Sequence, residues 1–449
     1  MKLTYNIQDK PKFGQLIVFA IQQLLAIMAA TLVVPIIVGN GMDSAAALFG
    51  AGIGTLVYLL FTGFKSPVFL GSSFAFIGSM AAAFAGAAST AVGYLGIIIG
   101  ALFACLVYVI IALIVKAVGT AWLDKIMPTV IVGPTVAIIG LSLAGNAISD
   151  LQKAPAGGHT LLAVLCGLVT LIVTTICSTF GKKMVKLIPF IIGILSGYAL
   201  AAILTFIGMA AGVDALKITD FSSLTGLVAD GVTVGTFLYL PQFTFLTAFG
   251  AFGEISGAYI GTVAVAYVPV AFVVFAEHIA DHKNISSIIE KDLLKDPGLD
   301  KTLMGDGVGS FAGAIFGGCP NTTYGESIAC VAITGNASVW TIFTTAILAI
   351  LISFIAPFVA FVNSIPSCIM GGVCIALYGF IAVSGLKMVQ KVDLEDNKNL
   401  FVVSTILICG IGGLTLNFGK LTITSIACAL ILGIIVNTIL TSIEGKKNK

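Results

Sequence analysis

The stretch "CPNTTYGESIACVAIT", residues 319–334, lies inside a long apolar tract and yet carries Pro320, Asn321, Gly325 and the carboxylate Glu326. Acids inside membrane-spanning segments are costly and normally face a cavity or a partner. Backbone that leaves the helical conformation at membrane depth is tolerated only where protein shelters it or where it lines a cavity. The stretch therefore predicts an interrupted helix at a functional site.

The remainder of the chain is equally apolar. Of its 449 residues, 58% are hydrophobic and 9% are charged. Apolar runs of about 18 or more residues, which are long enough to cross a hydrocarbon core of about 30 Å, recur from end to end. We expect an all-α polytopic membrane protein, and the composition argues against a soluble enzyme. A cleaved signal peptide is not expected, because Lys2, Asp9, Lys10 and Lys12 precede the first apolar run and many more runs follow.

Fourteen spans are predicted from these runs. They lie near residues 14–39, 44–63, 68–88, 91–117, 121–147, 160–178, 187–212, 257–280, 303–318, 320–335, 338–362, 366–386, 399–416 and 419–441. The stretch 232–252 is ambiguous, since it contains a proline and partial alternation of apolar residues. We expect it to form an outer interfacial segment, and a further span is the alternative.

The lysines support an even number of spans. With the N-terminus inside, loop alternation places all of the 22 basic residues on the cytoplasmic side except Lys153, Lys217 and Lys420. This distribution is what the positive-inside rule predicts for a protein with both termini in the cytoplasm. Every basic residue is a lysine, so the planar guanidinium clamp suited to phosphates is absent. The net charge of +2 is too small to indicate a nucleic-acid partner.

Two predicted spans are interrupted at equivalent positions. "SPVFLGSSFAFIGSM", residues 66–80, and the stretch that contains Glu326 belong to the third span of each set of seven. Matching interrupted spans in two halves are typical of transporters built from inverted repeats, with the binding site at the midplane. The alternative is that Gly71 and its serine neighbours merely allow close helix packing. Packing alone does not explain Glu326.

Two carboxylates fall well inside predicted spans. Glu277, within "AYVPVAFVVFAEHIADH", and Glu326 would each cost roughly 2.5–3.5 kcal/mol at the centre of a spanning helix. We therefore expect them to face a cavity and to carry function, the alternative being that backbone groups or a bound proton satisfy them. Glu254 and Asp306 are weaker candidates, because both are predicted at span ends.

The segment "EHIADH" also permits a metal site. His278 and His282 are four residues apart on one helix face, with Asp281 between them, and H-x-x-E-H is a zinc motif of peptidases. An intramembrane metal-dependent hydrolase is thus the alternative from another class. The third histidine, His159, is predicted near the opposite face of the membrane, so we expect neither a metal nor another cofactor, and no catalytic residue.

Taken together, several motifs resemble the uracil permeases of the nucleobase–ascorbate transporter family, also called nucleobase–cation symporter 2. The motifs are "AEHIADH", "GGCPNTTYGESIACVAIT", "LGSSFAFIGS", "KDLLKDPGLDKTLMGDG" and "SIPSCIMGGVCIALYGFIAVSGLKM". The resemblance implies two inverted repeats of seven spans, with a short antiparallel β-strand at the midplane in spans 3 and 10. It also implies a core domain (1–120 and 257–362), a gate domain (121–212 and 363–449, including a cytoplasmic tail) and an extracellular or interfacial connection (213–256).

The resemblance further implies the site residues and their roles. The substrate-binding residues by this pattern are Glu277, Glu326, Phe74, Gly325, Tyr324, Ala30 and Tyr378, and those for proton coupling are Glu277, Asp281 and His278. Uracil alternates N–H donors with carbonyl acceptors, which suits carboxylate oxygens beside free backbone N–H groups. The sequence departs from the family pattern at Gln23, Asp281, Ser327, Ala329 and Gly335.

The resemblance and the buried acids together predict a secondary transporter that imports uracil with protons across a bacterial cytoplasmic membrane. The same fold with xanthine or another nucleobase as substrate is the alternative. A doubly charged anion is disfavoured, because two buried acids would repel it in a site of low dielectric constant. The expected partners are the nucleobase, protons and the lipid bilayer, and the resemblance alone implies a homodimer.

Overall fold

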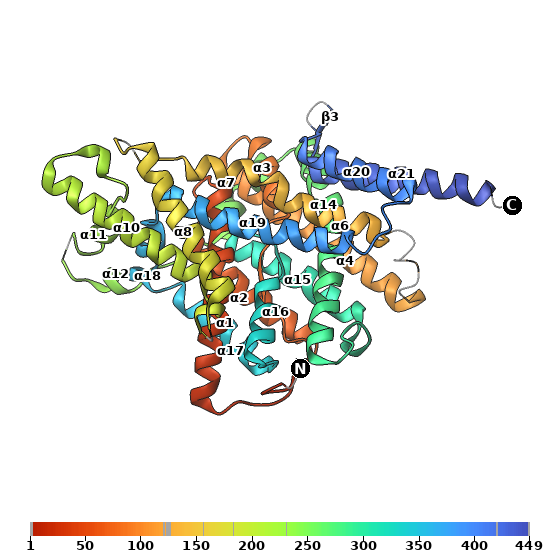
Figure 1. Ribbon diagram of the computed structural model, residues 1–449, viewed down its shortest axis with the longest axis horizontal. Helices are drawn as coiled ribbons and strands as arrows, with labels where there is room; N and C mark the ends of the chain where they lie inside the picture. The colour runs from red at the N-terminus through yellow and green to blue at the C-terminus, as the bar shows by residue number, and fades with distance from the viewer. Residues whose placement is uncertain are drawn as a thin grey trace.

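The computed structural model describes residues 3–119, 122, 127–155, 157–182, 184–229, 231–418 and 421–447. The fold is helical, with two short two-stranded sheets (Figure 1). The longer helices are α1 (Phe13–Val38), α2 (Ser44–Phe61), α3 (Ile77–Ala85), α4 (Thr90–Val118), α6 (Thr129–Ser142), α7 (Ala144–Leu151), α8 (Thr160–Phe180), α10 (Pro189–Ala211), α14 (Gly257–Ile289), α15 (Leu299–Gly317), α16 (Gly325–Thr334), α17 (Val339–Ile352), α18 (Ala356–Asn363), α19 (Ser367–Val389), α20 (Asn397–Ile411) and α21 (Ser425–Lys447).

The apolar helices confirm a polytopic membrane protein. Within the described residues, nine helices are long and apolar enough to cross a membrane, counting α6 and α7 as one. Each of the fourteen predicted ranges contains at least one helix, and the shorter helices fall in the interrupted segments and in the second half of the chain. The count of fourteen spans and the inverted repeat stay predictions. The predicted span starts at 121 and 419, and both chain termini, lie outside the described residues.

The two interrupted segments pair with each other. β1 (Leu70–Ser72) lies antiparallel to β2 (Asn321–Thr323), in a register that places Gly71 opposite Thr322. Both strands are buried, so their backbone groups need partners inside the protein. The hydroxyl of Thr55 on α2 accepts from the N–H of Leu70 at 2.9 Å, and its one hydrogen is shared between Leu70 O at 3.1 Å and Ala51 O at 2.8 Å. The location of this pair at the membrane midplane stays a prediction.

The helices pack in two groups (Figure 1). In the first group, α15 packs against α2 and α4, α14 packs against α4, and α17 packs against α1 and α2. In the second group, α19 packs against α6, α7 and α8, while α20 packs against α21 and α6. Helices α10 and α8 lie at one end of the long axis and α20 and α21 at the other. The interrupted segments belong to the first group, in which α16 also lies against α1.

The contact between α2 and α15 depends on glycine. A Cβ atom placed on Gly54 would lie 2.7 Å from the carbonyl oxygen of Gly309, and one placed on Gly50 would lie 2.5 Å from that of Gly313. Real Cβ atoms do not approach carbonyl oxygens this closely. The backbones of the two helices therefore touch, as small residues allow in membrane proteins.

The first described residues form a strap across the end of α16. The N–H of Thr4 donates to Gly335 O at 2.7 Å, and the N–H of Val339 donates to Ile7 O at 2.9 Å. The Ser338 hydroxyl donates to Asp9 O at 2.6 Å. The start of the chain is thus fixed to the segment that carries Glu326, although more than 300 residues separate them in sequence.

The structure corrects two predicted helix boundaries. Helix α14 continues to Ile289 rather than ending near 280, so His282 is fully buried instead of lying at a loop edge. Helix α15 starts at Leu299, and Asp306 is therefore two turns inside it and fully buried, not at a span end. In both cases the helix continues through polar residues that form buried hydrogen bonds, His282 with Tyr58 and Asp306 with His278. The stretch 232–252 forms only short helices, α12 (Val234–Phe237) and α13 (Thr244–Ala248), and part of a 3-10 helix.

Substitution of Gly54 by alanine should destabilise the protein. The added methyl group would overlap the backbone of α15, and overpacking of this kind costs about 1–3 kcal/mol. Gly379→Ala is the matched control, because its Cβ would meet nothing within 4 Å. We expect Gly54→Ala to lower the apparent Tm in detergent and Gly379→Ala to leave it unchanged or higher. Equal Tm values for the two variants would contradict the close backbone contact.

Candidate functional site

A cavity of about 330 Å³ lies beside the paired strands, within the usual size range of sites for small molecules. Helices α14, α16, α19 and α10 and strand β2 contribute to its wall. Its polar and aromatic lining includes Glu277, Asp281, Glu326, Phe74, Tyr324 and Gly325. Six of the nine residues predicted from the resemblance are therefore brought together in one cavity.

Three carboxyl groups face this cavity. Glu277 and Asp281 are four residues apart, so they lie on the same face of α14, and Glu326 is the second residue of α16. All three side chains are partly exposed in a region where most neighbours are buried. The Thr323 hydroxyl donates to Asp281 Oδ2 at 2.7 Å, which ties the end of β2 to α14. The cavity is rich in hydrogen-bond acceptors.

Backbone donors adjoin the carboxyl groups. Helix α16 begins at Gly325, and no side chain caps its N-terminus. The first N–H groups of a helix have no partner within the helix and carry partial positive charge. Gly325 is exposed to the cavity, and a Cβ there would meet nothing within 4 Å. A ligand can therefore meet carboxylate acceptors and backbone donors at the same place.

Four aromatic side chains line the cavity, namely Phe74, Tyr324, Phe190 and Phe380. Phe74 follows β1, and Tyr324 precedes α16. The Tyr324 hydroxyl donates to Ser72 O at 2.8 Å, so this side chain also braces the strand pair. The ring of Tyr378 lies edge-on to Phe74 with centroids 5.8 Å apart, but Tyr378 does not line the cavity. It supports Phe74 from behind.

A further predicted residue, Ala30, lies away from the cavity. Ala30 is buried in α1, and the residue of that helix in the cavity wall is Ala26, one turn earlier. Likewise Phe74 lines the cavity, whereas Phe76, two residues later, stacks on Tyr267 with ring centroids 5.4 Å apart and does not. Neighbouring positions on a helix or turn point in different directions, and the sequence alone does not fix which one faces a ligand.

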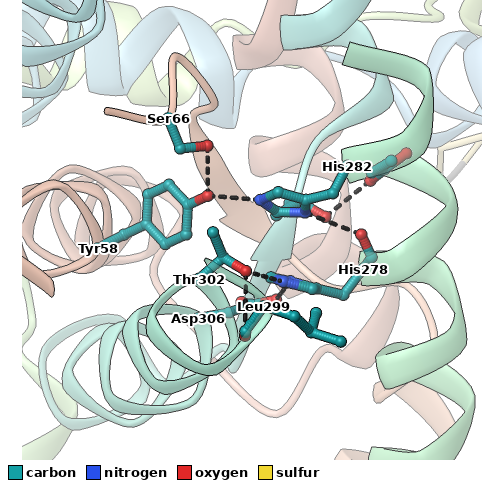
Figure 2. Close-up of polar contacts among 9 residues, drawn as sticks. Tyr58, Ser66, His278, His282, Leu299, Thr302 and Asp306 are labelled. Carbon is teal, nitrogen blue, oxygen red and sulfur yellow. Dashed lines mark hydrogen bonds and ion pairs between the residues drawn. The ribbon is translucent and has the colours of Figure 1, made fainter. Parts of the chain in front are cut away.

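His278 does not line the cavity, and its side chain belongs to a buried polar cluster (Figure 2). Its Nδ1 lies 2.7 Å from Asp306 Oδ2, and its Nε2 lies 3.1 Å from Thr302 Oγ1. His282 Nε2 lies 2.7 Å from the Tyr58 hydroxyl, and His282 Nδ1 lies 2.9 Å from the carbonyl oxygen of His278.

Protein atoms thus occupy all four ring nitrogens of His278 and His282. In the described part of the chain, no group of three or more histidine, cysteine, aspartate or glutamate residues is arranged to hold a metal ion. A metal ion bound by both histidines would have to displace one of these hydrogen bonds from each ring.

Sequence reasoning missed one buried connection. Gln23 Nε2 of α1 donates to both the hydroxyl and the carbonyl oxygen of Ser327, the latter at 3.3 Å. The N–H of Phe69 also donates to the Ser327 hydroxyl, at 3.1 Å. The residue after Glu326 is thereby joined to α1 and to the segment before β1. The signal was present, since Gln23 and Ser327 are two departures from the family pattern, and here they are partners.

Paired interrupted helices with carboxyl groups at a shared cavity, in a bundle of apolar helices, are features of membrane transporters. The comparisons with known proteins give the family. A model described as "Permease family" matches residues 14–419. The chain belongs to this family, and it is a multi-pass membrane transporter, not an enzyme.

Named relatives match almost the entire chain. A uracil permease of Bacillus caldolyticus is 37% identical over 98% of this chain and 95% of its own length. A uracil permease of Escherichia coli (strain K12) is 35% identical over 96% of this chain and 92% of its own. Among solved structures, the transmembrane domain of the cyanobacterial bicarbonate transporter BicA matches with a TM-score of 0.60 at 15% identity, covering 96% of this chain and all of that one. This last likeness concerns the fold alone.

Removal of the Ser327 hydroxyl should destabilise the protein. Ser327→Ala leaves the buried N–H of Phe69 and the amide of Gln23 without this acceptor, and an unsatisfied buried donor costs about 1–3 kcal/mol. Ser442→Ala, on the exposed end of α21, is the control. A lower Tm is expected for Ser327→Ala alone. In a double-mutant cycle with Gln23→Leu, additive effects would contradict the direct contact.

Proposed function

We propose that the protein imports uracil together with protons. The observation that carries this proposal is the cavity in which Glu277 and Glu326 adjoin the start of α16 at Gly325 and the ring of Phe74. The names of the relatives support uracil as the substrate. This is the substrate class that the arrangement of donors and acceptors suits best.

The chemistry of uracil matches the site. Its two N–H groups need acceptors, which Glu277 and Glu326 supply, and its two carbonyl oxygens need donors. The N–H groups at the start of α16 are the nearest donors, beginning with Gly325. The flat ring packs against Phe74, whose orientation is supported by Tyr378. Ionised Glu326 gives a charge-assisted hydrogen bond, which is stronger than a neutral one, and protonated Glu277 accepts through its carbonyl oxygen.

Proton coupling follows from the acids of the cavity. Glu277, Asp281 and Glu326 repel one another when all three are ionised, and their separation from bulk water strengthens that repulsion. Binding of a proton at Glu277 relieves it. In the proposed cycle, a protonated Glu277 accompanies uracil, and release of the proton inside weakens the site and frees the base. Asp281, one turn along α14, stabilises or relays this proton.

The proposed movement is alternating access between the two packing groups. The group that contains α14 and α16 corresponds to the expected core domain, and the group of α6, α8, α10 and α19 to the gate domain. The cavity is lined by residues of both groups, which supports a site at their interface. Its rim includes the exposed residues Lys186, Ile333 and Ser384, on the side that the lysine distribution makes cytoplasmic. We therefore take this conformation to be open inward.

Uptake of radiolabelled uracil into proteoliposomes tests the proposal directly. With an imposed inward proton gradient, we expect transient accumulation that a proton ionophore abolishes and that excess xanthine does not reduce. Competition by xanthine would favour a purine as substrate. Uptake that only reaches equilibrium, with or without the ionophore, would contradict proton coupling.

Substitutions of the two glutamates should separate coupling from binding. Glu277→Gln removes the exchangeable proton and should abolish accumulation driven by the gradient while exchange of internal for external uracil continues. Glu326→Ala removes a charged acceptor worth about 1.5–3 kcal/mol, and should weaken uracil binding about 10-fold to 100-fold.

Glu254→Gln is the matched control for both substitutions. Glu254 is exposed, and it lies 3.1 Å from the Ser89 hydroxyl, outside the cavity. This variant should transport as the unmodified protein does. If Glu277→Gln still concentrates uracil, Glu277 is not the proton carrier.

A further inference from the structure

The buried cluster behind the cavity contains titratable groups that the proposed transport cycle does not use. We propose that His278 and Asp306 share one proton more than a neutral imidazole and a carboxylate would carry, so that the pair has no net charge. We further propose that this proton is not exchanged during transport. The inference rests on the proposed function only in placing the transported proton elsewhere.

The hydrogen-bond geometry restricts where protons are (Figure 2). Thr302 Oγ1 lies 3.2 Å from the carbonyl oxygen of Leu299, to which only a donor can bond, so the hydroxyl hydrogen points there. The same oxygen then accepts from His278 Nε2 at 3.1 Å, and Nε2 must carry a hydrogen. The remaining contact joins His278 Nδ1 to Asp306 Oδ2 at 2.7 Å and also needs one hydrogen.

Two protonation states satisfy these contacts, and both are neutral as a pair. Either Asp306 is a carboxylic acid that donates to Nδ1 of a neutral imidazole, or Asp306 is a carboxylate that accepts from an imidazolium. Each state has one proton more than a neutral His278 beside an ionised Asp306. The difference between the two states is only the position of that proton along the 2.7 Å contact.

The alternative, a net negative pair, requires Thr302 to turn its hydroxyl hydrogen toward Nε2. Asp306 would then be a fully buried carboxylate whose Oδ1 has no hydrogen-bond partner. In the described part of the chain, the group that forms an ion pair with Asp306 is His278, and no lysine does so. A buried charge without a counter-charge is strongly unfavourable. The neutral pair is therefore the stable arrangement.

Among the described residues, the surroundings of the pair supply no other charge to compensate. His282 stacks on His278 with centroids 4.0 Å apart, and it donates through Nδ1 to His278 O and accepts at Nε2 from the Tyr58 hydroxyl, as a neutral ring does. Ser66 completes this chain through its contact with Tyr58 at 2.6 Å. Tyr108 of α4 lies edge-on to His278 at 6.5 Å. On α14, Glu277 and Asp281 are also close in sequence, but both face the cavity.

Burial separates the pair from the proton pathway. His278 and Asp306 have no exposed side-chain surface, and neither lines the cavity. Glu277 and Asp281 thus lie on one face of α14 and His278 on another, where it meets Asp306 of α15. His278 is a positioning residue that fixes α14 on α15, and the transported proton belongs to the cavity carboxyl groups.

The chain contains three histidines, so nuclear magnetic resonance of ring nitrogens can test this inference in the full-length protein. His159→Asn removes the exposed histidine that caps α8 and replaces it with another good cap. In protein labelled with 15N-histidine, we expect a one-bond 15N–1H coupling at His278 Nε2 and, for His282, at Nδ1. Tyr58→Phe should shift only the His282 signals, and Thr302→Val only those of His278, which assigns them.

The expected His278 Nε2–H signal persists between about pH 5 and 8 and does not change when uracil is added. An unprotonated His278 Nε2 would overturn the neutral pair. A signal that is lost with pH or uracil would overturn the claim that this proton is not exchanged. If neither assignment variant folds, the unmodified protein still tests the proposal. If neither of the buried rings, His278 and His282, carries a hydrogen at Nε2, the proposal is excluded. The measurement needs no transport, so a persistent signal in a protein that fails to carry uracil would refute the substrate and leave this inference intact.

Discussion

The pairing of β1 with β2 is the interaction on which the site depends. Backbone N–H and C=O groups in an apolar interior must bond to something, and a helix normally satisfies them within one segment. Here each interrupted segment instead uses the other, with Thr55 completing the bonds of Leu70. Because the strands are satisfied in this way, α16 can begin inside the protein. Its unpaired first turn then faces the cavity rather than lipid.

Helix α14 organises the remainder of the site by separating two sets of polar groups. Glu277 and Asp281 are four residues apart and lie on the cavity face of α14. His278 and His282 are also four residues apart, and they face α15 and α2. A helix with 3.6 residues per turn keeps two such sets on adjacent strips of its surface. The carboxyl groups face the cavity, whereas the imidazoles meet fixed protein partners. One helix thus serves both binding and anchoring.

Hydropathy and the family resemblance predicted much of this arrangement. The apolar runs predicted the fourteen ranges, each of which contains a helix, and placed Glu277 and Glu326 inside them, and the resemblance predicted the paired strands. The predictions that were wrong concern features that depend on contacts between residues far apart in the sequence. The end of α14 was placed near 280 because hydropathy falls there, yet His282 is held by Tyr58, 224 positions away. Asp306 was placed at a span end for the same reason, and the sequence did not show that His278 is its hydrogen-bond partner. The bond between Gln23 and Ser327 joins residues 304 positions apart, and no local pattern encodes it.

A coupled transporter needs a limited number of protons to move with each substrate. Every additional carboxyl group that could exchange its proton would add a route by which protons cross without uracil. The fold reduces this risk by geometry: the acids that reach the cavity are partly exposed, and Asp306 is fully buried beside a histidine that neutralises it. The buried pair still stabilises the contact between α14 and α15, because a pair without net charge leaves no uncompensated ion in the interior. Anchoring by a neutral pair is therefore compatible with coupling, whereas an ionised anchor next to Glu277 would compete for the same proton.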